Sequence, residues 1–203
     1  MSQKVQDYYE KNVVNAKPGA SATATVKQTV VSVLSDSHAY NQGSWFRQTV
    51  EAGNVPGAVL GVFASQPGAS AEVLANRVRQ AVSLDGVVIV QAGTNDLMSA
   101  VSPEDAAKNV EALVAGVKEG GNKPVLALIP PSDTRGDLVM ETNALLKQYA
   151  AANKVGLLDV TAPVIAEDGT WKPGLTTDGV HANTQGAKLM AGAAAKQLPA
   201  LIR

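Results

Sequence analysis

The sequence predicts a three-layer α/β/α domain, in which a five-stranded parallel sheet lies between two layers of helices. Short runs of β-branched and apolar residues alternate along the chain with amphipathic stretches of helical length, which is the pattern of strand–helix–strand units. Two of these runs, Val87–Val90 and Val125–Ile129, are apolar throughout, as expected for strands that helices cover on both faces. A length of 203 residues suits one domain with a sizeable core.

The strands and helices are expected to alternate from residue 29 to the end of the chain. Ser102 before Pro103 predicts a helix start, because serine caps a helix N-terminus and proline suits its first position. Ser70 followed by Glu72 predicts another start, since an acidic residue is favourable in the first turn. The expected strands are Thr29–Leu34, Ala58–Ala64, Gly86–Gln91, Pro124–Ile129 and Val155–Asp159. The expected helices are Ser44–Ala52, Ser70–Val82, Pro103–Glu119, Asp137–Asn153 and Thr184–Leu201.

The first 26 residues differ in composition from the rest. Ser2–Asn15 suits a short helix, and Ala16–Thr25 is small, polar and typical of a linker. We therefore divide the chain into an N-terminal arm, residues 1–26, and a domain, residues 27–203. The arm suits a spacer or docking segment, which leaves open that the domain is part of a larger polypeptide or assembly. The first residues lack an apolar signal segment, so the prediction is a cytoplasmic protein by default, or an extracellular one as part of a larger protein.

The composition excludes several classes of function. The 17 basic and 18 acidic side chains give a net charge of −1, so no nucleic-acid partner is expected. The absence of cysteine excludes disulfides, thiolate catalysis and cysteine-ligated zinc. No apolar stretch approaches the roughly 20 residues that cross a bilayer, and no acidic or histidine cluster has the spacing of metal ligands. We therefore expect no metal, no cofactor and no membrane span.

Polar residues with chemical potential follow the first three predicted strands. The carboxyl ends of parallel strands carry the functional groups in such folds. Ser37 follows the first strand, Gly68 the second and Asn95 the third. Ser37 could expose its hydroxyl where the chain leaves the sheet, Gly68 allows a ligand to approach its N–H, and Asn95 offers an amide donor. Each also has an ordinary structural interpretation, as a helix cap for Ser37 and as turn residues for the other two.

The most informative segment lies just before the last predicted helix. Asp178-Gly179 favours a tight turn, and such a turn folds the Asp178 carboxylate back onto His181. A carboxylate paired with an imidazole fixes its tautomer and stabilises the imidazolium that forms when the other nitrogen takes a proton. The alternative is a surface histidine at a helix start. The chain has only two histidines, which favours the functional interpretation of the one that follows this turn.

Together these residues supply the parts of a serine-type acyl-transfer site. Ser37 would be the nucleophile, His181 its base and Asp178 the group that orients the base. The backbone N–H of Ser37, the backbone N–H of Gly68 and the side-chain amide of Asn95 would form the oxyanion hole. His38 is the other histidine, but no neighbour at a fixed short spacing orients it as a base, so a place in the acyl or alcohol pocket suits it better.

Four segments of the chain resemble the four sequence blocks of the SGNH (GDSL) hydrolase family of serine esterases. The resemblance covers residues 29–190 and implies a flavodoxin-like three-layer fold, a catalytic role for Ser37, Asp178 and His181, and an oxyanion hole of Ser37, Gly68 and Asn95. Ser35 replaces the family's usual glycine, His38 a common leucine and Ala182 a frequent proline. The matching segments are Ser35-Asp36-Ser37, Ala64–Ser70, Gly93-Thr94-Asn95-Asp96 and Asp178-Gly179-Val180-His181, followed by Asn183 and Gly186.

The resemblance implies a serine ester hydrolase that acts on small-molecule or glycan esters. No long apolar insertion lies between the strands, which favours short acyl groups such as acetyl esters on carbohydrate. Two alternatives stay open, a lipase or lysophospholipase of the same family and a non-enzymatic attachment or assembly module. A nucleotide-binding domain is rejected, because the loop after the first strand, Ser35–His38, is not glycine-rich.

Overall fold

The computed structural model describes residues 28–203 and has a sheet of five parallel strands. The strand order is β2-β1-β3-β4-β5, in which the chain runs outward from β1 to β2 and then crosses to the other side of β1. Ser35, at the end of β1, pairs with Ser65 of β2 and with Gln91 of β3. Ligand sites lie at such switch points. The strands are β1 (Thr29–Ser35), β2 (Ala58–Ser65), β3 (Val87–Gln91), β4 (Lys123–Ala127) and β5 (Gly156–Leu158).

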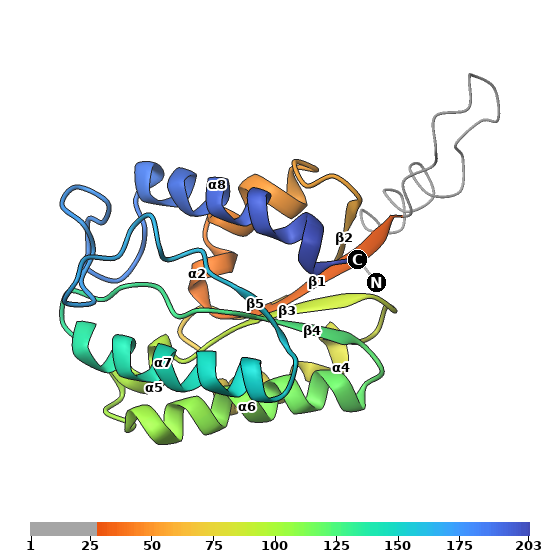
Figure 1. Cartoon of the computed structure of the whole chain (residues 1–203), viewed down its shortest axis with the longest axis horizontal. Coiled ribbons are helices and arrows are strands. Elements are labelled where there is room, and N and C mark those ends of the chain that lie inside the picture. The colour runs from red at the N-terminus through yellow and green to blue at the C-terminus, as the bar shows by residue number, and fades with distance from the viewer. Residues whose placement is uncertain (1–27) are drawn as a thin grey trace.

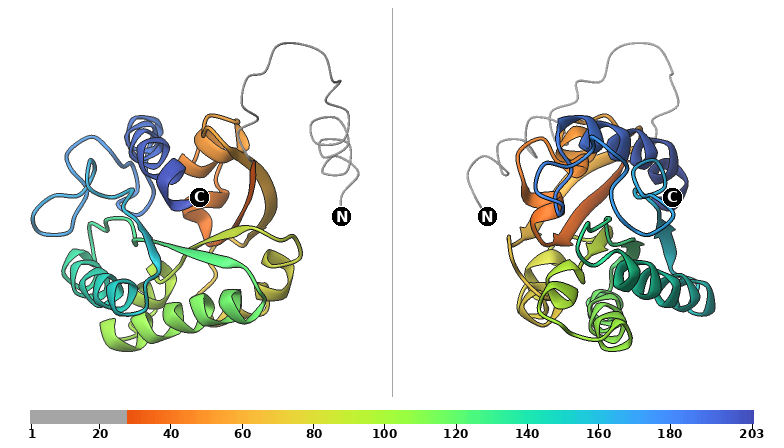
Figure 2. Two further views of the ribbon diagram at one scale, coloured as in Figure 1. Left: turned by 45° about the vertical axis from the view of Figure 1, so that its right-hand side comes forward. Right: turned by 90° about the vertical axis from the view of Figure 1, so that its left-hand side faces the viewer.

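Helices cover both faces of the sheet and complete the three layers (Figures 1 and 2). One layer, at the bottom of Figure 1, holds the long helices α6 (Pro103–Glu119) and α7 (Gly136–Ala152). The other layer contains α8 (Thr184–Leu201), the short α2 (Ser37–Tyr40) and the π-helical turn η2 (Arg47–Glu51). The predicted α/β/α class and the five-stranded parallel sheet are therefore confirmed.

Alternate residues of the central strands face two separate hydrophobic cores. In β3, Val88 and Val90 pack with the α6 and α7 layer, while Val87 and Ile89 pack with the α8 layer. All four side chains are buried. A strand covered on both faces must be apolar on both faces, which explains why the run Val87–Val90 does not alternate with polar residues.

Two long helices, α6 and α8, begin at the residues that the sequence predicted. The Ser102 side chain accepts the N–H of Asp105 and Pro103 is the first residue of α6, so this helix has the predicted bounds. At α8, which also has the predicted bounds, the Asn183 side chain accepts the N–H groups of Gln185 and Gly186. These side chains satisfy N–H groups that have no partner within the helix.

The structure corrects the predicted helices in three places. The predicted helix Ser70–Val82 is two short helices, α3 (Ala71–Ala75) and α4 (Val78–Ala81). It breaks at Arg77, whose guanidinium Nε donates to the side chain of Gln66 beyond the end of β2. The predicted helix Ser44–Ala52 ends in the π-helical turn. Two short helices were not predicted, α2 and α5 (Thr94–Met98), because each begins within a polar segment that also suits a turn.

Gly93 joins β3 to α5 in a backbone conformation that other residues rarely adopt. Its φ is +111°, and a Cβ there would lie 2.6 Å from Cδ1 of Ile129. We expect Gly93→Ala to lower the free energy of unfolding by about 1–3 kcal/mol, from conformational strain and crowding together, as measured by urea unfolding. Gly121→Ala is the matched control, because its φ is +85° but nothing lies within 4 Å of an added Cβ. An equal loss in both variants would contradict the steric part of this account.

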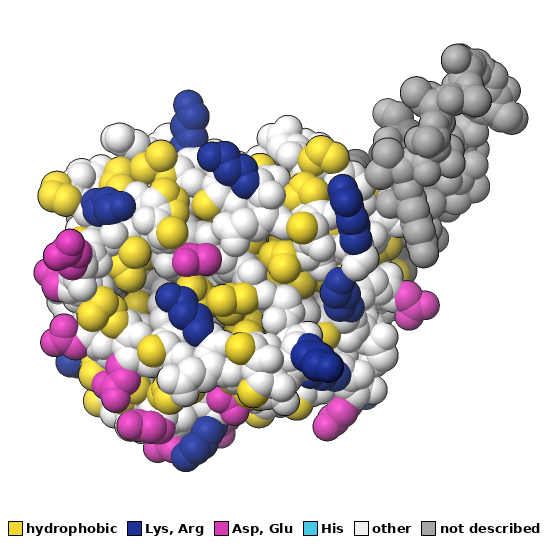
Figure 3. Space-filling view, viewed as in Figure 1, with side chains coloured by type: hydrophobic (Ala, Val, Ile, Leu, Met, Phe, Trp, Pro, Cys, Tyr) yellow, Lys and Arg dark blue, Asp and Glu magenta, His cyan; other side chains and the backbone are white. Residues whose placement is uncertain are grey.

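The division into an arm and a domain is not tested by the structure, since the arm, residues 1–26, and the predicted helix within it lie outside the described residues. Within residues 28–203, no helix is long and apolar enough to span a bilayer. Figure 3 shows one face of the molecule, with Lys and Arg side chains spread across it and Asp and Glu gathered toward the lower left.

Candidate active site

Ser37 lies where β1 passes directly into a helix. Asp36 is the cap of α2, because its Oδ1 accepts the N–H of His38, and Ser37 is the first residue of the helix. Ser37 is 8% exposed. Its own N–H has no acceptor among the described residues, as is usual for the first N–H of a helix. The sequence therefore places a hydroxyl and a free backbone donor together at the central strand end.

His181 and Asp178 lie in one hydrogen-bonded turn before α8. Asp178 Oδ1 accepts the backbone N–H groups of Val180 and His181 at 2.9 and 2.7 Å, while Oδ2 contacts His181 Nδ1 at 2.8 Å. The Thr176 hydroxyl donates to the carbonyl of His181 and accepts the N–H of Gly179. The turn therefore holds both the backbone and the ring of His181.

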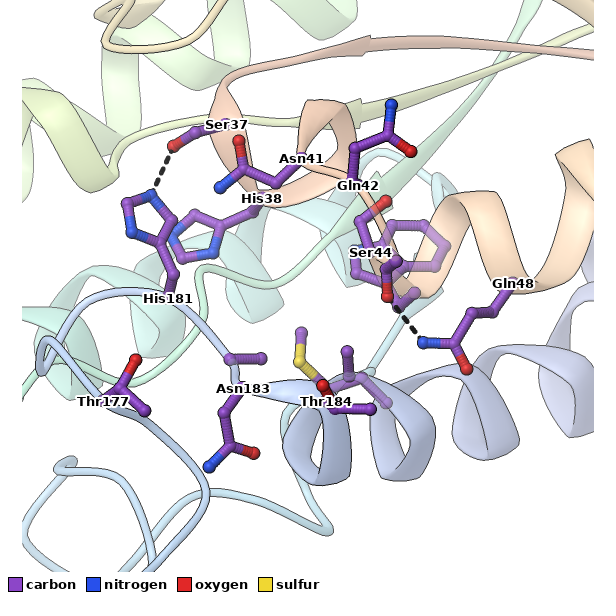
Figure 4. A pocket seen from close by; sticks show the side chains of 15 residues that line it. Ser37, His38, Asn41, Gln42, Ser44, Gln48, Thr177, His181, Asn183 and Thr184 are labelled. Carbon is purple, nitrogen blue, oxygen red and sulfur yellow. Dashed lines mark hydrogen bonds between the residues drawn. The ribbon is translucent and has the colours of Figure 1, made fainter.

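The ring of His181 bridges Asp178 and Ser37. Its Nε2 lies 2.8 Å from Ser37 Oγ, as the dashed line in Figure 4 shows. A carboxylate accepts only, so Nδ1 carries the proton and donates it to Asp178. Nε2 then carries the lone pair and accepts the hydroxyl proton of Ser37. This tautomer is the one that a general base for Ser37 requires.

The Asp178 carboxylate is held in its charged form. Partial burial acts to raise its pKa, but the N–H of His181, the His181 ring and the N–H of Val180 outweigh burial and lower the pKa well below its usual range. A group that accepts several hydrogen bonds in its ionised form titrates at lower pH. Asp178 is therefore ionised at neutral pH, and its charge can stabilise a protonated His181 ring.

Asn95 and Gly68 lie at the neighbouring strand ends. The Asn95 Nδ2 donates to the Ala69 carbonyl at 3.0 Å and makes a longer contact of 3.4 Å to Asp36 Oδ2. Asn95 thus links the residue before Ser37 to the residue after Gly68. Gly68 is exposed, its φ is +71°, and its N–H has no acceptor among the described residues. The three predicted oxyanion donors are thereby grouped at one edge of the sheet, with the Asn95 amide bonded to oxygens of Ala69 and Asp36.

Asp96 and Trp45 hold the surrounding loops. Asp96 accepts the N–H of Ala71 and the side-chain amide of Asn109, which makes it a structural partner of the strand-end loops. The Trp45 indole is buried and donates to the Gln91 side chain at the end of β3. Within the described part of the chain, no group of three or more His, Asp or Glu side chains is placed to hold a metal ion.

A cavity of about 390 Å³ opens beside Ser37 and His181. It is bounded by the segment after α2 and by the start of α8 (Figure 4). Gly68, Asn95 and Asp178 do not line it, so of the predicted oxyanion donors only Ser37 borders the cavity. Most of the other lining residues were not predicted, because glutamine, asparagine and threonine in loops carry no chemical signature. They include Asn41, Gln42, Gln48, Thr177 and Thr184.

Two buried titratable residues beside Ser37 have opposite effects on stability. Burial raises the pKa of Asp36 from 3.8 to about 7, against the N–H of His38 and the charge of His181, which lower it. Burial and the charge of His181 lower the pKa of His38 from 6.5 to about 3. As the pH rises from about 4 to 7, Asp36 lowers the free energy of unfolding, because the folded state binds more protons than the unfolded state. Between about pH 3 and 6.5 His38 raises it, because here the unfolded state binds more.

Removing one of these opposing groups should expose the effect of the other. We expect Asp36→Asn to give a free energy of unfolding that rises more steeply with pH than that of the unmodified protein between pH 4 and 6, by up to about 1.4 kcal/mol per pH unit. Urea unfolding at several pH values measures the two slopes. His38→Gln is the reverse control. Its free energy of unfolding should rise less steeply with pH than that of the unmodified protein over the same range. Parallel curves for all three proteins would show that neither group titrates abnormally.

The likenesses to known proteins agree with this geometry. The model of the GDSL-like Lipase/Acylhydrolase family matches residues 19–189. One similar solved structure is a GDSL-like lipase from Bacteroides thetaiotaomicron VPI-5482, at 23% identity, a TM-score of 0.67 and 96% coverage of each chain. Another is Est24, a carbohydrate acetylesterase from Sinorhizobium meliloti, at 18% identity, a TM-score of 0.68 and coverage of 86% of this chain and 100% of that one.

A third similar structure is the lipase/acylhydrolase from Enterococcus faecalis, at 18% identity, a TM-score of 0.66 and coverage of 87% of this chain and 97% of that one. At such identities the solved structures show a shared fold alone. No curated protein matches the chain. The family model, by contrast, spans all five strands and the turn that holds His181. The chain therefore belongs to the GDSL-like lipase/acylhydrolase family, the SGNH hydrolases.

Proposed function

We propose that this hydrolase cleaves carboxylic esters of short acyl groups, acetyl esters on carbohydrate among them, through an acyl-enzyme on Ser37. The observation that carries the proposal is the continuous hydrogen-bonded series from Ser37 through His181 to Asp178, with both distances at 2.8 Å. Such a series is the geometric signature of an activated serine nucleophile. No metal or cofactor takes part in the proposed reaction.

In the first half of the proposed reaction, Ser37 Oγ attacks the ester carbonyl carbon and His181 Nε2 takes the hydroxyl proton. The carbonyl π-electrons move to oxygen, and the N–H groups of Ser37 and Gly68 with the amide of Asn95 stabilise that oxyanion. When the oxyanion collapses, the bond to the alcohol oxygen breaks and His181 gives its proton to the leaving alcohol. The acyl group stays on Ser37.

In the second half a water molecule replaces the alcohol. His181 takes a proton from the water as the water oxygen attacks the acyl carbon, and the second oxyanion forms at the same donors. Collapse breaks the bond to Ser37 Oγ, which receives the proton back from His181. The products are a carboxylic acid and an alcohol, and the enzyme returns to its starting state.

The role proposed for Asn95 has a measurable consequence. Asn95→Ala should lower kcat by roughly 10²–10³-fold with little change in KM, because the amide acts on the oxyanion and not on the ground-state ester. The amide must first exchange its contact with Asp36 for the oxyanion, and the 3.4 Å length of that contact makes the exchange inexpensive. Steady-state hydrolysis of 4-nitrophenyl acetate measures both constants. An unchanged kcat would remove Asn95 from the oxyanion hole.

The strand connections support a short acyl group. No long apolar insertion lies between the strands, whereas a long acyl chain needs continuous apolar walls. The fold shared with the carbohydrate acetylesterase Est24 adds support. The test is a series of 4-nitrophenyl esters from two to twelve carbons, followed by acetate release from acetylated glycans. A preference for eight carbons or more would favour the lipase or lysophospholipase alternative.

The alternative of a non-enzymatic module is disfavoured by membership of a hydrolase family. A fluorophosphonate probe, which reacts with activated serines, tests it directly. Labelling that is lost in Ser37→Ala supports the enzyme. Absence of labelling in the unmodified protein would favour a module that has kept the fold.

A further inference from the structure

The cavity beside Ser37 has an uncharged, hydrogen-bonding lining. No Asp, Glu, Lys or Arg side chain lines it. Four carboxamide side chains and several hydroxyl groups line it; of these, Asn183, Gln48 and Ser44 already bond to the protein. Trp45, Ala182, Ala187 and Met190 supply its apolar part. The carboxamides of Asn41 and Gln42 have no hydrogen-bond partner among the described residues, and both residues are exposed. A charged ligand would find no counter-charge there, whereas neutral donors and acceptors would find several partners.

His38 is the buried member of this lining. It is 6% exposed and its ring lies 5.3 Å from the ring of His181, tilted by 42° (Figure 4). Its Nε2 is fully enclosed and has no hydrogen-bond partner among the described residues. Nδ1 also has no such partner, and because it is not enclosed it is the ring nitrogen that a molecule in the cavity can reach. The Nδ1 of a ring that is only 6% exposed therefore has no protein partner, and a molecule in the cavity is what can satisfy it.

The chemistry of His38 selects a particular kind of group. Burial and the charge of His181 lower the pKa of His38 to about 3, so the ring is neutral at neutral pH. A neutral imidazole has one N–H donor and one acceptor nitrogen and no net charge. An alcohol hydroxyl both donates and accepts, and so it can pair with either nitrogen. A quaternary ammonium or a phosphate would gain no charge pairing from this ring.

The position of the cavity decides which half of the ester it receives. In the proposed mechanism His181 protonates the oxygen of the leaving alcohol, so the alcohol must lie against His181. His181 and the residues after it, Ala182–Thr184, form one wall of the cavity. Gly68 and Asn95, which would hold the oxyanion, are absent from its lining. The cavity is therefore on the alcohol side of Ser37.

We propose that this cavity binds the alcohol half of the ester, that this half is an uncharged group bearing several hydroxyls, and that His38 is a specificity-determining residue that hydrogen-bonds to one of them. The inference rests on the proposed function and makes it specific. It assigns the short acyl group to the side of Ser37 where Gly68 and Asn95 lie, and it gives a function to the histidine that stands next to the nucleophile.

The test compares three acetyl esters that differ only in the alcohol. Methyl 6-O-acetylglucoside and cyclohexylmethyl acetate are both esters of a primary alcohol on a six-membered ring, and only the first bears hydroxyls. Acetylcholine carries a charged alcohol instead. Acetate release gives kcat/KM for each. We expect the unmodified enzyme to prefer the glucoside over the other two by about tenfold or more, since a site with unpaired polar groups discriminates against analogues that cannot pair with them.

Variants test the residue itself. His38→Leu should reduce the preference for the glucoside over cyclohexylmethyl acetate by about tenfold, mainly through a higher KM for the glucoside, while His38→Gln should retain more of the preference because it keeps a donor and an acceptor. The double variant Asn41→Ala with Gln42→Ala changes only exposed side chains and should also reduce the preference. If His38→Leu impairs folding, this double variant still tests whether the cavity lining sets the preference for the glucoside. Gln148→Ala, an exposed carboxamide on α7, is the matched control.

The outcomes separate this inference from the function on which it rests. Fluorophosphonate labelling of Ser37 together with the expected change of preference supports both. Labelling and ester hydrolysis without any preference for the glucoside, or a His38→Leu variant that lowers kcat/KM equally for both ring esters, overturns the inference alone. Absence of labelling and of hydrolysis for all three esters overturns the proposed function and the inference with it.

Discussion

Ser37→Ala is expected to lower kcat for ester hydrolysis by on the order of 10⁶-fold, since removal of a serine nucleophile costs about as much as removal of its whole catalytic unit. The hydroxyl of Ser37 is the group that His181 Nε2 contacts at 2.8 Å, and alanine supplies nothing to attack the ester carbon. Residual hydrolysis of roughly 10³–10⁴-fold over the reaction in water would come from binding and from the oxyanion donors.

The fold should survive this change. Asp36, and not Ser37, caps α2 through its contact with the N–H of His38, and the only contact of the Ser37 hydroxyl among the described residues is with His181. Ser35→Ala is a matched control two residues away, because Ser35 is buried and its hydroxyl makes one weak contact of 3.4 Å to the carbonyl of Asp36. The control should keep fluorophosphonate labelling. Labelling of Ser37→Ala at the rate of the unmodified protein would place the nucleophile elsewhere.

The fold could be predicted almost completely from local pattern. The apolar runs at β3 and β4 identified strands buried on both faces, and capping residues gave the start of α6 to the residue. The break between α3 and α4 could not be predicted, because Asn76 and Arg77 between the two helices are neither glycine nor proline. In the structure Arg77 donates to the side chain of Gln66 beyond the end of β2, a contact that helical periodicity does not reveal.

The candidate site likewise has parts that the sequence predicts and parts that it does not. The pairing of Asp178 with His181 is local, over three residues and one turn, so the sequence alone predicts it. The contact of Ser37 with His181 spans 144 residues, and its prediction depended on the resemblance of four separate segments to the blocks of one family. The cavity lining was not predictable. It combines loop residues near Asn41 with the start of α8, and only their packing against each other creates the space between them.

Asp178→Asn should lower kcat by on the order of 10⁴-fold through a change of tautomer, an effect known from the corresponding substitution in other serine hydrolases. The asparagine oxygen can replace Oδ1, which accepts the N–H groups of Val180 and His181. Its amide nitrogen must then face His181 Nδ1, where Oδ2 accepted a proton before. Nδ1 becomes an acceptor, the ring proton moves to Nε2, and Nε2 can no longer take the proton of Ser37.

Asp178→Asn should leave the free energy of unfolding almost unchanged, because the Asp178 side chain is 52% exposed and the contacts of its Oδ1 position with two backbone N–H groups remain. Asp168→Asn is the matched control, since Asp168 makes the same kind of contacts, to the N–H and hydroxyl of Thr170, without touching a histidine. Proton NMR of the two histidines reports the tautomer directly. A rate within tenfold of the unmodified enzyme, with the proton still on Nδ1, would mean that the carboxylate charge does not orient the base. A slow variant with the proton on Nε2 would establish that His181 acts only when Asp178 holds its other nitrogen.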